Sequence, residues 1–318
     1  MNAAVLYTLG KPPRFGQFPE PIPGEGEVIV HVRAASLKPI DKQMASGSHY
    51  ASPRELPVVC GIDGVGSLGD GTRVFFGGPR RPYGAMAERT VLRRAQCFPV
   101  PDGLSDDIAA ALPNPGVSAW LTLKSRAKLA AGETVLILGA TGVTGKLAVQ
   151  IAKLLGAGRV IAAGRNVEVL NTLRELGADA TIQIDKRGED LAVALAREAG
   201  ETGFQVVIDY LWGRPTEALL AALTRSEFAM AAFETRLVQV GESAGATISL
   251  PAATLRSTLL TIVGTAGIPS RDILTEALQQ VMAHGANGKL RIDTERVPLS
   301  DIANAWQREQ RSRLVVIP

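Results

Sequence analysis

The segment at residues 134–155 reads TVLILGATGVTGKLAVQIAKLL, and it decides the fold of the region around it. A run of apolar residues typical of a buried strand leads directly into a loop with spaced glycines. In the stretch that follows, Leu147, Ile151 and Leu155 recur every four residues, which is the apolar stripe of a helix packed on a sheet. The segment is therefore predicted to form a strand, a tight turn and a helix.

The same alternation continues along the middle of the chain. Further short apolar runs occur at residues 159–163, 180–184, 205–209, 236–240 and 259–263, with amphipathic stretches between them. Strands that are apolar on both faces and alternate with helices form a doubly wound parallel sheet. Residues 116–267 are therefore predicted to be an α/β domain.

The flanking regions have a different pattern. Residues 1–115 are rich in Gly and Pro, with β-type runs at 27–32, 73–76 and 89–92 and little helical periodicity, which predicts an irregular, mostly β domain. Residues 268–318 contain one helical stretch (273–283) and an apolar end (314–317) that is typical of a strand. Because this tail is too short to fold alone, we expect it to return to the N-terminal domain and complete its sheet.

The composition is that of an ordinary globular protein. The chain has 318 residues, 46% hydrophobic and 20% charged, and its 34 basic and 31 acidic residues are scattered, so we expect no nucleic-acid partner and no membrane surface. Its two cysteines, Cys60 and Cys97, are too few for a disulfide framework or a closed zinc site, which favours a reducing compartment. With no signal-type leader and no apolar run of about 18 residues, the protein is expected to be soluble and cytoplasmic.

The loop GATGVTG at residues 139–145 predicts dinucleotide binding. Aligned on Gly142 and Gly145, it is a G-x-G-x-x-G fingerprint in which Ala140 takes the first glycine position. Gly142 allows the backbone to approach a pyrophosphate and Gly145 allows the helix to pack on the strand, while the helix N-terminus attracts the phosphates. A plain strand-to-helix turn is the alternative.

The end of the second strand distinguishes NADPH from NADH. An NAD site places a carboxylate there, but this chain has Gly164, Arg165 and Asn166. We expect Arg165 to bind the 2′-phosphate of NADPH, although a solvated loop residue remains the alternative. Asp209, at the end of the 205–209 run, is expected either near the cofactor or as a structural cap. The residues predicted to bind the cofactor are Ala140, Thr141, Gly142, Val143, Thr144, Gly145, Gly164, Arg165, Asn166, Asp209 and Gly241.

Four segments resemble a known family. Residues 34–41 (AASLKPID) are similar to its A-x-x-L-N-P-x-D, and residues 61–66 (GIDGVG) to its G-x-E/D-x-x-G. LPNPGVSAW at 112–120 and GKL at 288–290 also match. Over nearly its whole length the chain resembles the zinc-independent quinone oxidoreductases of the medium-chain dehydrogenase/reductase (MDR) superfamily. The resemblance implies a Rossmann domain with a GroES-like catalytic domain, and a homodimer in which residues 259–263 are an edge strand paired across a two-fold axis.

The zinc-dependent alcohol dehydrogenases of this superfamily need a catalytic Cys where Lys38 stands and a His where Ile62 stands. An ammonium has no lone pair and an alkyl chain has no ligand atom, so we expect no metal. Cys60 and Cys97 are expected to be small buried side chains. A lysine in the family's Asn position could face the cleft, favouring a carbonyl or acidic substrate or bonding the nicotinamide ribose, or could point to solvent.

Without a metal, hydrogen bonds must stabilise the oxyanion that forms on hydride transfer. Tyr50, which matches a cleft tyrosine of the family, is the leading donor, with a packing role as its alternative. His49 is a second candidate, or an exposed loop residue, while Asp41 and Asp63 are expected to bond backbone. The leading function is an NADPH-dependent reductase of quinones or α,β-unsaturated carbonyls. The alternatives are a catalytically inactive NADPH-binding protein, acting as redox sensor or structural protein, and, after these, an alcohol dehydrogenase.

Overall fold

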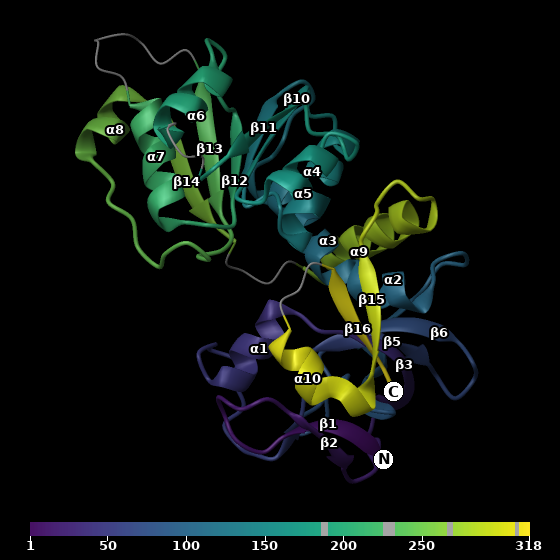
Figure 1. The fold of residues 1–318 in the computed structure, drawn as a ribbon. Helices are drawn as coiled ribbons and strands as arrows, with labels where there is room; N and C mark the ends of the chain where they lie inside the picture. The colour runs from purple at the N-terminus through teal and green to yellow at the C-terminus, as the bar shows by residue number, and fades with distance from the viewer. Residues whose placement is uncertain (186–189, 225–232, 266–269, 309–311) are drawn as a thin grey trace. The chain divides into compact units, whose positions relative to one another are not determined.

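The computed structural model describes residues 1–185, 190–224, 233–265, 270–308 and 312–318 (Figure 1). The chain divides into a first unit, Met1–Asn114 with Leu278–Pro318, and a second unit, Pro115–Ala277. The boundary expected between residues 267 and 268 falls on residues outside the described part. The division lies instead within helix α9 (Arg271–Ala286).

The second unit contains a parallel sheet. Among the described residues its strand order is β11-β10-β9-β12-β13-β14, and every pairing in it is parallel. The strands are β9 (Thr134–Leu138), β10 (Arg159–Gly164), β11 (Ala180–Gln183), β12 (Val206–Asp209), β13 (Glu234–Gln239) and β14 (Leu259–Gly264). Numbered along the chain this order is 3-2-1-4-5-6, that of a doubly wound dinucleotide-binding sheet. The predicted parallel sheet is confirmed, with small shifts at strand ends.

Helices cover both faces of this sheet. Helix α4 packs on β9 and β10, whereas α6 and α7 contact each other and share a core with Leu136, Leu138 and Val207 (Figure 1). Because all of β9 is buried, its residues are apolar on both faces. The helices are α3 (Pro113–Leu121), the π-helical turn η2 (Thr122–Arg126), α4 (Val143–Leu154), α5 (Val167–Thr172), α6 (Leu191–Ala199), α7 (Gly213–Leu223) and α8 (Ala252–Ser257).

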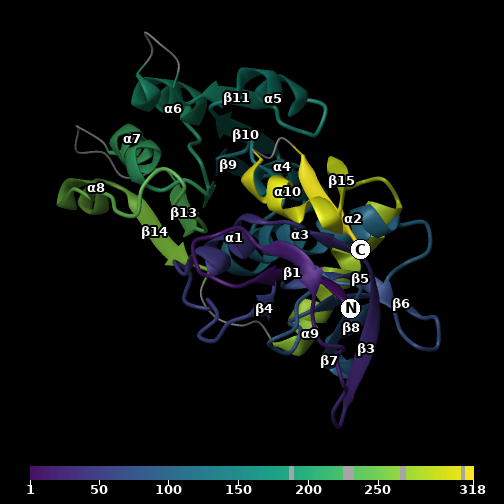
Figure 2. The ribbon, with the colours of Figure 1, turned by 60° about the horizontal axis from the view of Figure 1, so that its bottom comes forward.

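The first unit is mostly β. Among the described residues a three-stranded sheet has the order β2-β1-β4, and a larger sheet has the order β15-β16-β3-β5-β6-β8, with β7 beside β3 (Figure 2). The strands are β1 (Asn2–Leu6), β2 (Arg14–Gln17), β3 (Glu27–Ser36), β4 (Val58–Val59), β5 (Asp63–Ser67), β6 (Arg73–Gly77), β7 (Arg89–Arg93), β8 (Cys97–Pro99), β15 (Thr294–Pro298) and β16 (Arg313–Ile317). The pairings are antiparallel except that of β15 with β16.

The C-terminal strand lies in the larger sheet of this unit. Val315 of β16 is opposite Ser36 and Val316 is opposite Ala35 of β3. Leu314 and Val316 belong to the same buried cluster as Val30, Leu37 and Phe76. The two ends of the chain therefore build one core.

The first unit also contains short helices, both within residues 1–115, where the sequence shows little helical periodicity, and in its C-terminal part. They are α1 (Pro39–Ser46), η1 (Arg94–Gln96), α2 (Asp106–Ala111), η3 (Leu299–Asp301) and α10 (Ile302–Gln307). Helix α1 begins with Pro39 in its first turn and ends at Gly47, whose φ is 85°. Such short helices hold too few turns for their periodicity to stand out. None of the helices in the described ranges is long and apolar enough to cross a membrane.

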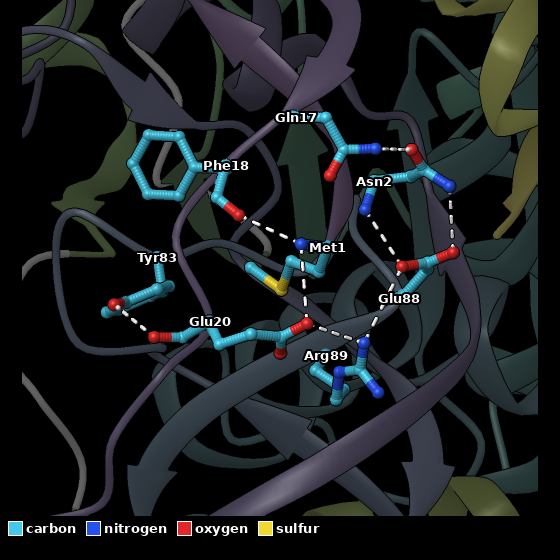
Figure 3. A network of polar contacts seen from close by, with 8 residues as sticks. All are labelled: Met1, Asn2, Gln17, Phe18, Glu20, Tyr83, Glu88 and Arg89. Carbon is cyan, nitrogen blue, oxygen red and sulfur yellow. Dashed lines mark hydrogen bonds and ion pairs between the residues drawn. The ribbon is translucent and has the colours of Figure 1, made fainter.

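Polar contacts anchor the N-terminus to this unit (Figure 3). The amino group of Met1 donates to the Phe18 carbonyl at 2.9 Å and forms an ion pair with Glu20 at 3.3 Å. The Asn2 backbone N–H and side-chain amide donate to the two carboxylate oxygens of Glu88 at 2.8 and 2.9 Å. These hydrogen bonds, the backbone one foremost, lower the pKa of Glu88. Strand β1 is thereby held at its first residue, Asn2, and at Met1 directly before it.

Candidate active site

The turn between β9 and α4 begins at Gly139. Its φ is 90°, in the left-handed region that favours glycine, and the backbone N–H groups of Gly139 and Ala140 both donate to the Ala163 carbonyl at 2.9 Å. Gly139 therefore makes the sharp turn, and Ala140, assigned to the first glycine position from the sequence, is simply the buried residue after it. Gly139, to which the alignment on Gly142 and Gly145 gives no role, is the glycine at which the chain turns.

Two glycines of this loop have different roles. A Cβ on Gly145 would overlap the Gly139 carbonyl oxygen and the Ala140 backbone, so Gly145 sets how closely α4 packs on the strand. A Cβ on Gly142 would meet nothing nearer than the Gly139 oxygen at 3.5 Å. Gly142 is the exposed N-cap of α4 and has no side chain that could accept hydrogen bonds from the first N–H groups of the helix. Val143 and Thr144 are the first two residues of the helix. The loop thus leaves backbone donors in open space, which fits a pyrophosphate.

Gly164 at the end of β10 fits closely against this loop. A Cβ on Gly164 would lie 2.5 Å from Cγ2 and 2.8 Å from Oγ1 of Thr141. The glycine therefore makes room for the Thr141 side chain, and its place beside the cofactor stays a prediction.

Arg165 and Asn166 follow Gly164 and differ in role. Asn166 is the N-cap of α5, its side-chain oxygen accepting from the Val169 N–H at 3.1 Å. Arg165 is exposed and lines an open cavity of about 870 Å³ in the second unit. The cavity is also lined by residues at the ends of β11 and β12, by the first turns of α6 and α7, and by the loop after β13: Ile184, Asp185, Asp190, Leu191, Ala192, Leu211, Arg214, Pro215, Glu217, Ala218, Ala221, Ser243 and Ala244.

Asp209 has the structural role that was the alternative to cofactor contact. Its Oδ1 accepts from the Leu211 and Trp212 N–H groups at 2.8 and 2.9 Å, and its Oδ2 from the Thr216 hydroxyl at 2.5 Å. The carboxylate is fully buried, and burial raises its pKa. Asp209 therefore holds the turn between β12 and α7. A Cβ on Gly241 would lie 2.8 Å from the Tyr210 carbonyl oxygen, so Gly241 permits the crossing of two backbone segments.

Lys38 lies neither in an open cleft nor in solvent, which corrects both orientations considered for it. Its side chain is 1% exposed, and Nζ contacts the Asp63 carboxylate at 2.7 Å and the Ser36 carbonyl at 2.8 Å. A second carboxylate, Asp41, lies 3.5 Å from Nζ. Asp41 also accepts from the backbone N–H groups of Lys38 and Ile62, at 2.9 and 3.2 Å. The lysine joins β3, β5 and the first turn of α1.

Arg313 completes a buried group of four charges. It is 3% exposed and donates to the Leu37 carbonyl at 3.0 Å, and burial lowers its pKa while Asp41 and Asp63 favour its charged form. Burial likewise raises the pKa of Asp63, and the Lys38 ammonium offsets part of that effect. Two cations and two carboxylates leave this group with no net charge, which is the condition under which buried charges are tolerated.

The residues at the positions of zinc ligands do not form a metal site. Lys38 is engaged in the charge group, and Ile62 offers no ligand atom. Among the described residues no three His, Cys, Asp or Glu side chains are close enough together to hold a metal ion. Cys60 is buried, as expected, but Cys97 is only half-buried.

Tyr50 and His49 follow α1 in the first unit. The Tyr50 side chain is 97% exposed, which excludes the packing role considered for it, and its ring centroid lies 4.1 Å from that of His49 at an angle of 32°. His49 is half-buried, and its Nδ1 accepts from the Ala51 N–H at 3.1 Å. The Tyr50 hydroxyl is accessible to a ligand, and the imidazole supports its ring.

Comparisons with known proteins agree with this geometry. The family model described as zinc-binding dehydrogenase matches residues 143–283. A probable NADPH-dependent quinone reductase of Emericella nidulans is 27% identical over all of both chains, and the 2-methylene-furan-3-one reductase of Solanum lycopersicum is 31% identical over 52% of this chain and 47% of that enzyme. The quinone oxidoreductase of Thermus thermophilus, solved also in complex with NADPH, aligns over all of both chains with 29% identity and a TM-score of 0.81.

The chain is a quinone-oxidoreductase-like member of the MDR superfamily. Its two units accordingly have the Rossmann and GroES-like folds of that superfamily, and the expected fold class is confirmed. Within this MDR protein, the charge group around Lys38 lies in the motifs AASLKPID and GIDGVG, whose two aspartates are its acids.

The GroES-like unit of this MDR protein contains a cavity of about 210 Å³. Its lining is largely apolar and includes Ile62, Met44 and Cys60, with Asp41 and Arg81 as charged residues. Lys38, His49 and Tyr50 are not part of this lining. Burial raises the pKa of the Cys60 thiol, so this thiol stays protonated and poorly nucleophilic.

Several residues that shape these sites could not be identified, or were not identified, from the sequence of this MDR protein. The first glycine of the loop, Gly139, could have been found from the requirement for a turn directly after the strand. Arg214 shares the cavity with Arg165, but nothing in the sequence relates positions so far apart. Arg313 reaches the Lys38 group only because β16 pairs with β3. The Tyr210 hydroxyl is buried without a hydrogen-bond partner among the described residues, a feature that only atomic contacts reveal.

The two glycines of the loop predict contrasting variants. Gly145→Ala should lower the free energy of unfolding by about 1–3 kcal/mol, because its Cβ overlaps the backbone. Gly142→Ala should change stability by no more than about 0.5 kcal/mol but weaken NADPH binding tenfold or more, because its Cβ enters the space for the pyrophosphate. Urea denaturation and NADPH titration measure the two effects. Equal behaviour of the two variants would contradict these roles.

The buried charges predict that removing Lys38 alone costs more stability than removing Lys38 and Asp63 together. Lys38→Met leaves Asp63 buried without its cation and should cost about 3–5 kcal/mol at pH 7, whereas the double variant Lys38→Met/Asp63→Asn, which restores zero net charge, should recover part of that loss. In Lys38→Met the pKa of Asp63 rises further above its ordinary 3.8, so stability should be higher near pH 4 and fall as the pH rises toward 7. Denaturation midpoints across pH test this, and additive losses would refute it.

Proposed function

We propose that this protein is an NADPH-dependent oxidoreductase that transfers hydride to quinones or α,β-unsaturated carbonyls without zinc. The observation that carries the proposal is a pyrophosphate cradle followed, at the end of the next strand, by an arginine and no carboxylate. The NADPH-dependent quinone reductase and the furanone reductase among its relatives support both acceptor classes.

The chain's own residues account for cofactor binding. Backbone N–H groups at the start of α4 bind the pyrophosphate, Gly142 leaves room for it, and Arg165 binds the 2′-phosphate. Asp209 holds the loop after β12. When bound, NADPH would supply the hydride.

The acceptor class follows from the catalytic unit. Lys38 and Ile62 offer no ligand for a metal that could polarise an isolated carbonyl. A conjugated acceptor needs less help, because its product anion is already delocalised. Tyr50 donates a hydrogen bond to the developing oxygen anion, and His49 supports the Tyr50 ring and is the second proton source. Lys38 acts from a distance by holding Asp63 and the start of α1.

The proposed setting is a reducing, cytoplasmic one, in keeping with two free cysteines. The proposed quaternary structure is a homodimer through β14, the last strand of the parallel sheet among the described residues, where Leu259 is 56% exposed. The proposed substrate is a small molecule.

The reaction is tested by following NADPH oxidation at 340 nm with quinones, conjugated enones and simple aldehydes and ketones. Conjugated acceptors should be reduced, whereas simple aldehydes and ketones should not. The active protein should contain far less than one zinc per chain and should keep its activity in the presence of a chelator. Tyr50→Phe should lower kcat roughly tenfold to a thousandfold while NADPH affinity stays unchanged. Tyr7→Phe, at another exposed tyrosine of the same unit, is the matched control and should have normal kcat.

Three results would contradict the proposal. Stoichiometric zinc that is lost together with activity would establish an alcohol-dehydrogenase-like site. Normal turnover by Tyr50→Phe would transfer proton delivery to His49 or water. NADPH binding without reduction of any acceptor would favour the catalytically inactive reading.

The dimer is tested by changing the exposed edge. Light scattering at micromolar concentration should give twice the chain mass, and Leu259→Lys should reduce it to the monomer mass, because a charge on an edge strand opposes pairing. Leu255→Lys, on an exposed residue of α8, should leave the dimer intact. A monomeric wild-type protein would refute the assembly.

A further inference from the structure

Arg214 is the second cation of the cavity that Arg165 lines. It lies in the first turn of α7, whereas Arg165 follows β10, so two elements far apart in the sequence each place an arginine at one cavity. Both side chains are exposed, and none of the hydrogen bonds or ion pairs between described residues involves either guanidinium. Two guanidinium groups in one cavity are therefore available for an anion.

The backbone that carries Arg214 is held in an uncommon conformation. Trp212, directly before α7, has a φ of 56°, and Gly213 has a φ of 61°. A Cβ on Gly213 would lie 2.7 Å from the Ala244 carbonyl oxygen. The buried Asp209 carboxylate maintains this turn through the Leu211 and Trp212 N–H groups. A strained turn kept by a buried carboxylate is typical of a functional position, and here it fixes the origin of the Arg214 side chain.

The acidic residues of the cavity form no ion pair with either arginine within the described part of the chain. Asp190 Oδ1 accepts from the Ala192 N–H at 2.7 Å, and Glu217 Oε1 accepts from the Ser249 N–H at 2.7 Å. These carboxylates thus serve backbone groups, and Asp185 is the third acid of the lining. Apolar side chains such as Ile184 and Leu211 offer a surface for a flat base. The lining combines an apolar surface with two free cations, which suits an adenosine phosphate.

We propose that Arg214 binds the 2′-phosphate of NADPH together with Arg165, so that preference for NADPH is set by a pair of arginines from β10 and α7. The inference rests on the proposed cofactor and adds a specificity-determining residue to it. A phosphate presents several acceptor oxygens, and each planar guanidinium can engage two of them. Because both would act on one phosphate, their contributions should be coupled rather than independent.

The test is equilibrium binding to the full chain, by calorimetry, of NADPH, NADH, 2′,5′-ADP and ADP. Arg214→Ala should weaken binding of NADPH and 2′,5′-ADP about tenfold to a hundredfold and leave NADH and ADP unchanged. Arg214→Lys should give an intermediate loss, since it keeps the charge but not the planar fork. Arg165→Ala should act in the same direction, and the double variant should lose an amount that differs from the product of the two single losses.

Arg256→Ala is the matched control, because Arg256 is an exposed arginine in α8 of the same unit and does not line the cavity. This variant should bind all four nucleotides as the wild-type protein does. The inference would be overturned if Arg214→Ala weakened the binding of NADPH and NADH equally, or of neither. The proposed cofactor would still stand in that case if Arg165→Ala removed the preference for NADPH. A wild-type protein that binds NADH as tightly as NADPH would overturn the proposed cofactor and this inference together.

Discussion

The close approach of α4 to the end of β9 is the constraint on which the second unit depends. Gly139 turns the chain in a conformation that favours glycine, and Gly145 has no Cβ to separate the helix from that turn. The helix therefore starts directly beneath the carboxyl end of the sheet, with its unsatisfied N–H groups exposed beside Gly142. One packing requirement thus places the N–H groups at the start of α4 at the carboxyl end of the sheet.

The first unit depends on a different interaction, the buried ion pair of Lys38 with Asp63. This pair lies where β3, β5 and α1 meet, and Arg313 brings the C-terminal strand to the same point. Burying charges costs stability unless they are paired and hydrogen-bonded, so the group requires all of its members at once. Lys38 therefore has an electrostatic role within the protein interior. The unit is thereby fixed by charges that are paired in its interior.

The two units obtain function from these constraints in different ways. In the second unit, buried carboxylates such as Asp209 shape loops, and the exposed Arg165 and Arg214 remain free to bind. In the first unit, the accessible hydroxyl of Tyr50 is separate from the buried Lys38 group. In both, the groups that bear the structure are buried, whereas those open to a ligand are exposed at the ends of elements.

The parallel sheet and its glycine loop could be read from the sequence, because apolar runs, helical periodicity and turn glycines are local signals that each cover only a few neighbouring residues. The short helices α1, α2 and α10 gave no such signal, since fewer than three turns leave little periodicity. The position of Lys38 depends on partners distant in the chain, Asp63 and Arg313. Both orientations expected from the sequence, toward a cleft or toward solvent, were therefore wrong. The segments that form the nucleotide-binding sheet could be predicted from local patterns alone. Which charges neutralise each other inside the protein and which stay unpaired depends on the fold, because burial and pairing arise between residues that the chain separates widely and the fold brings together.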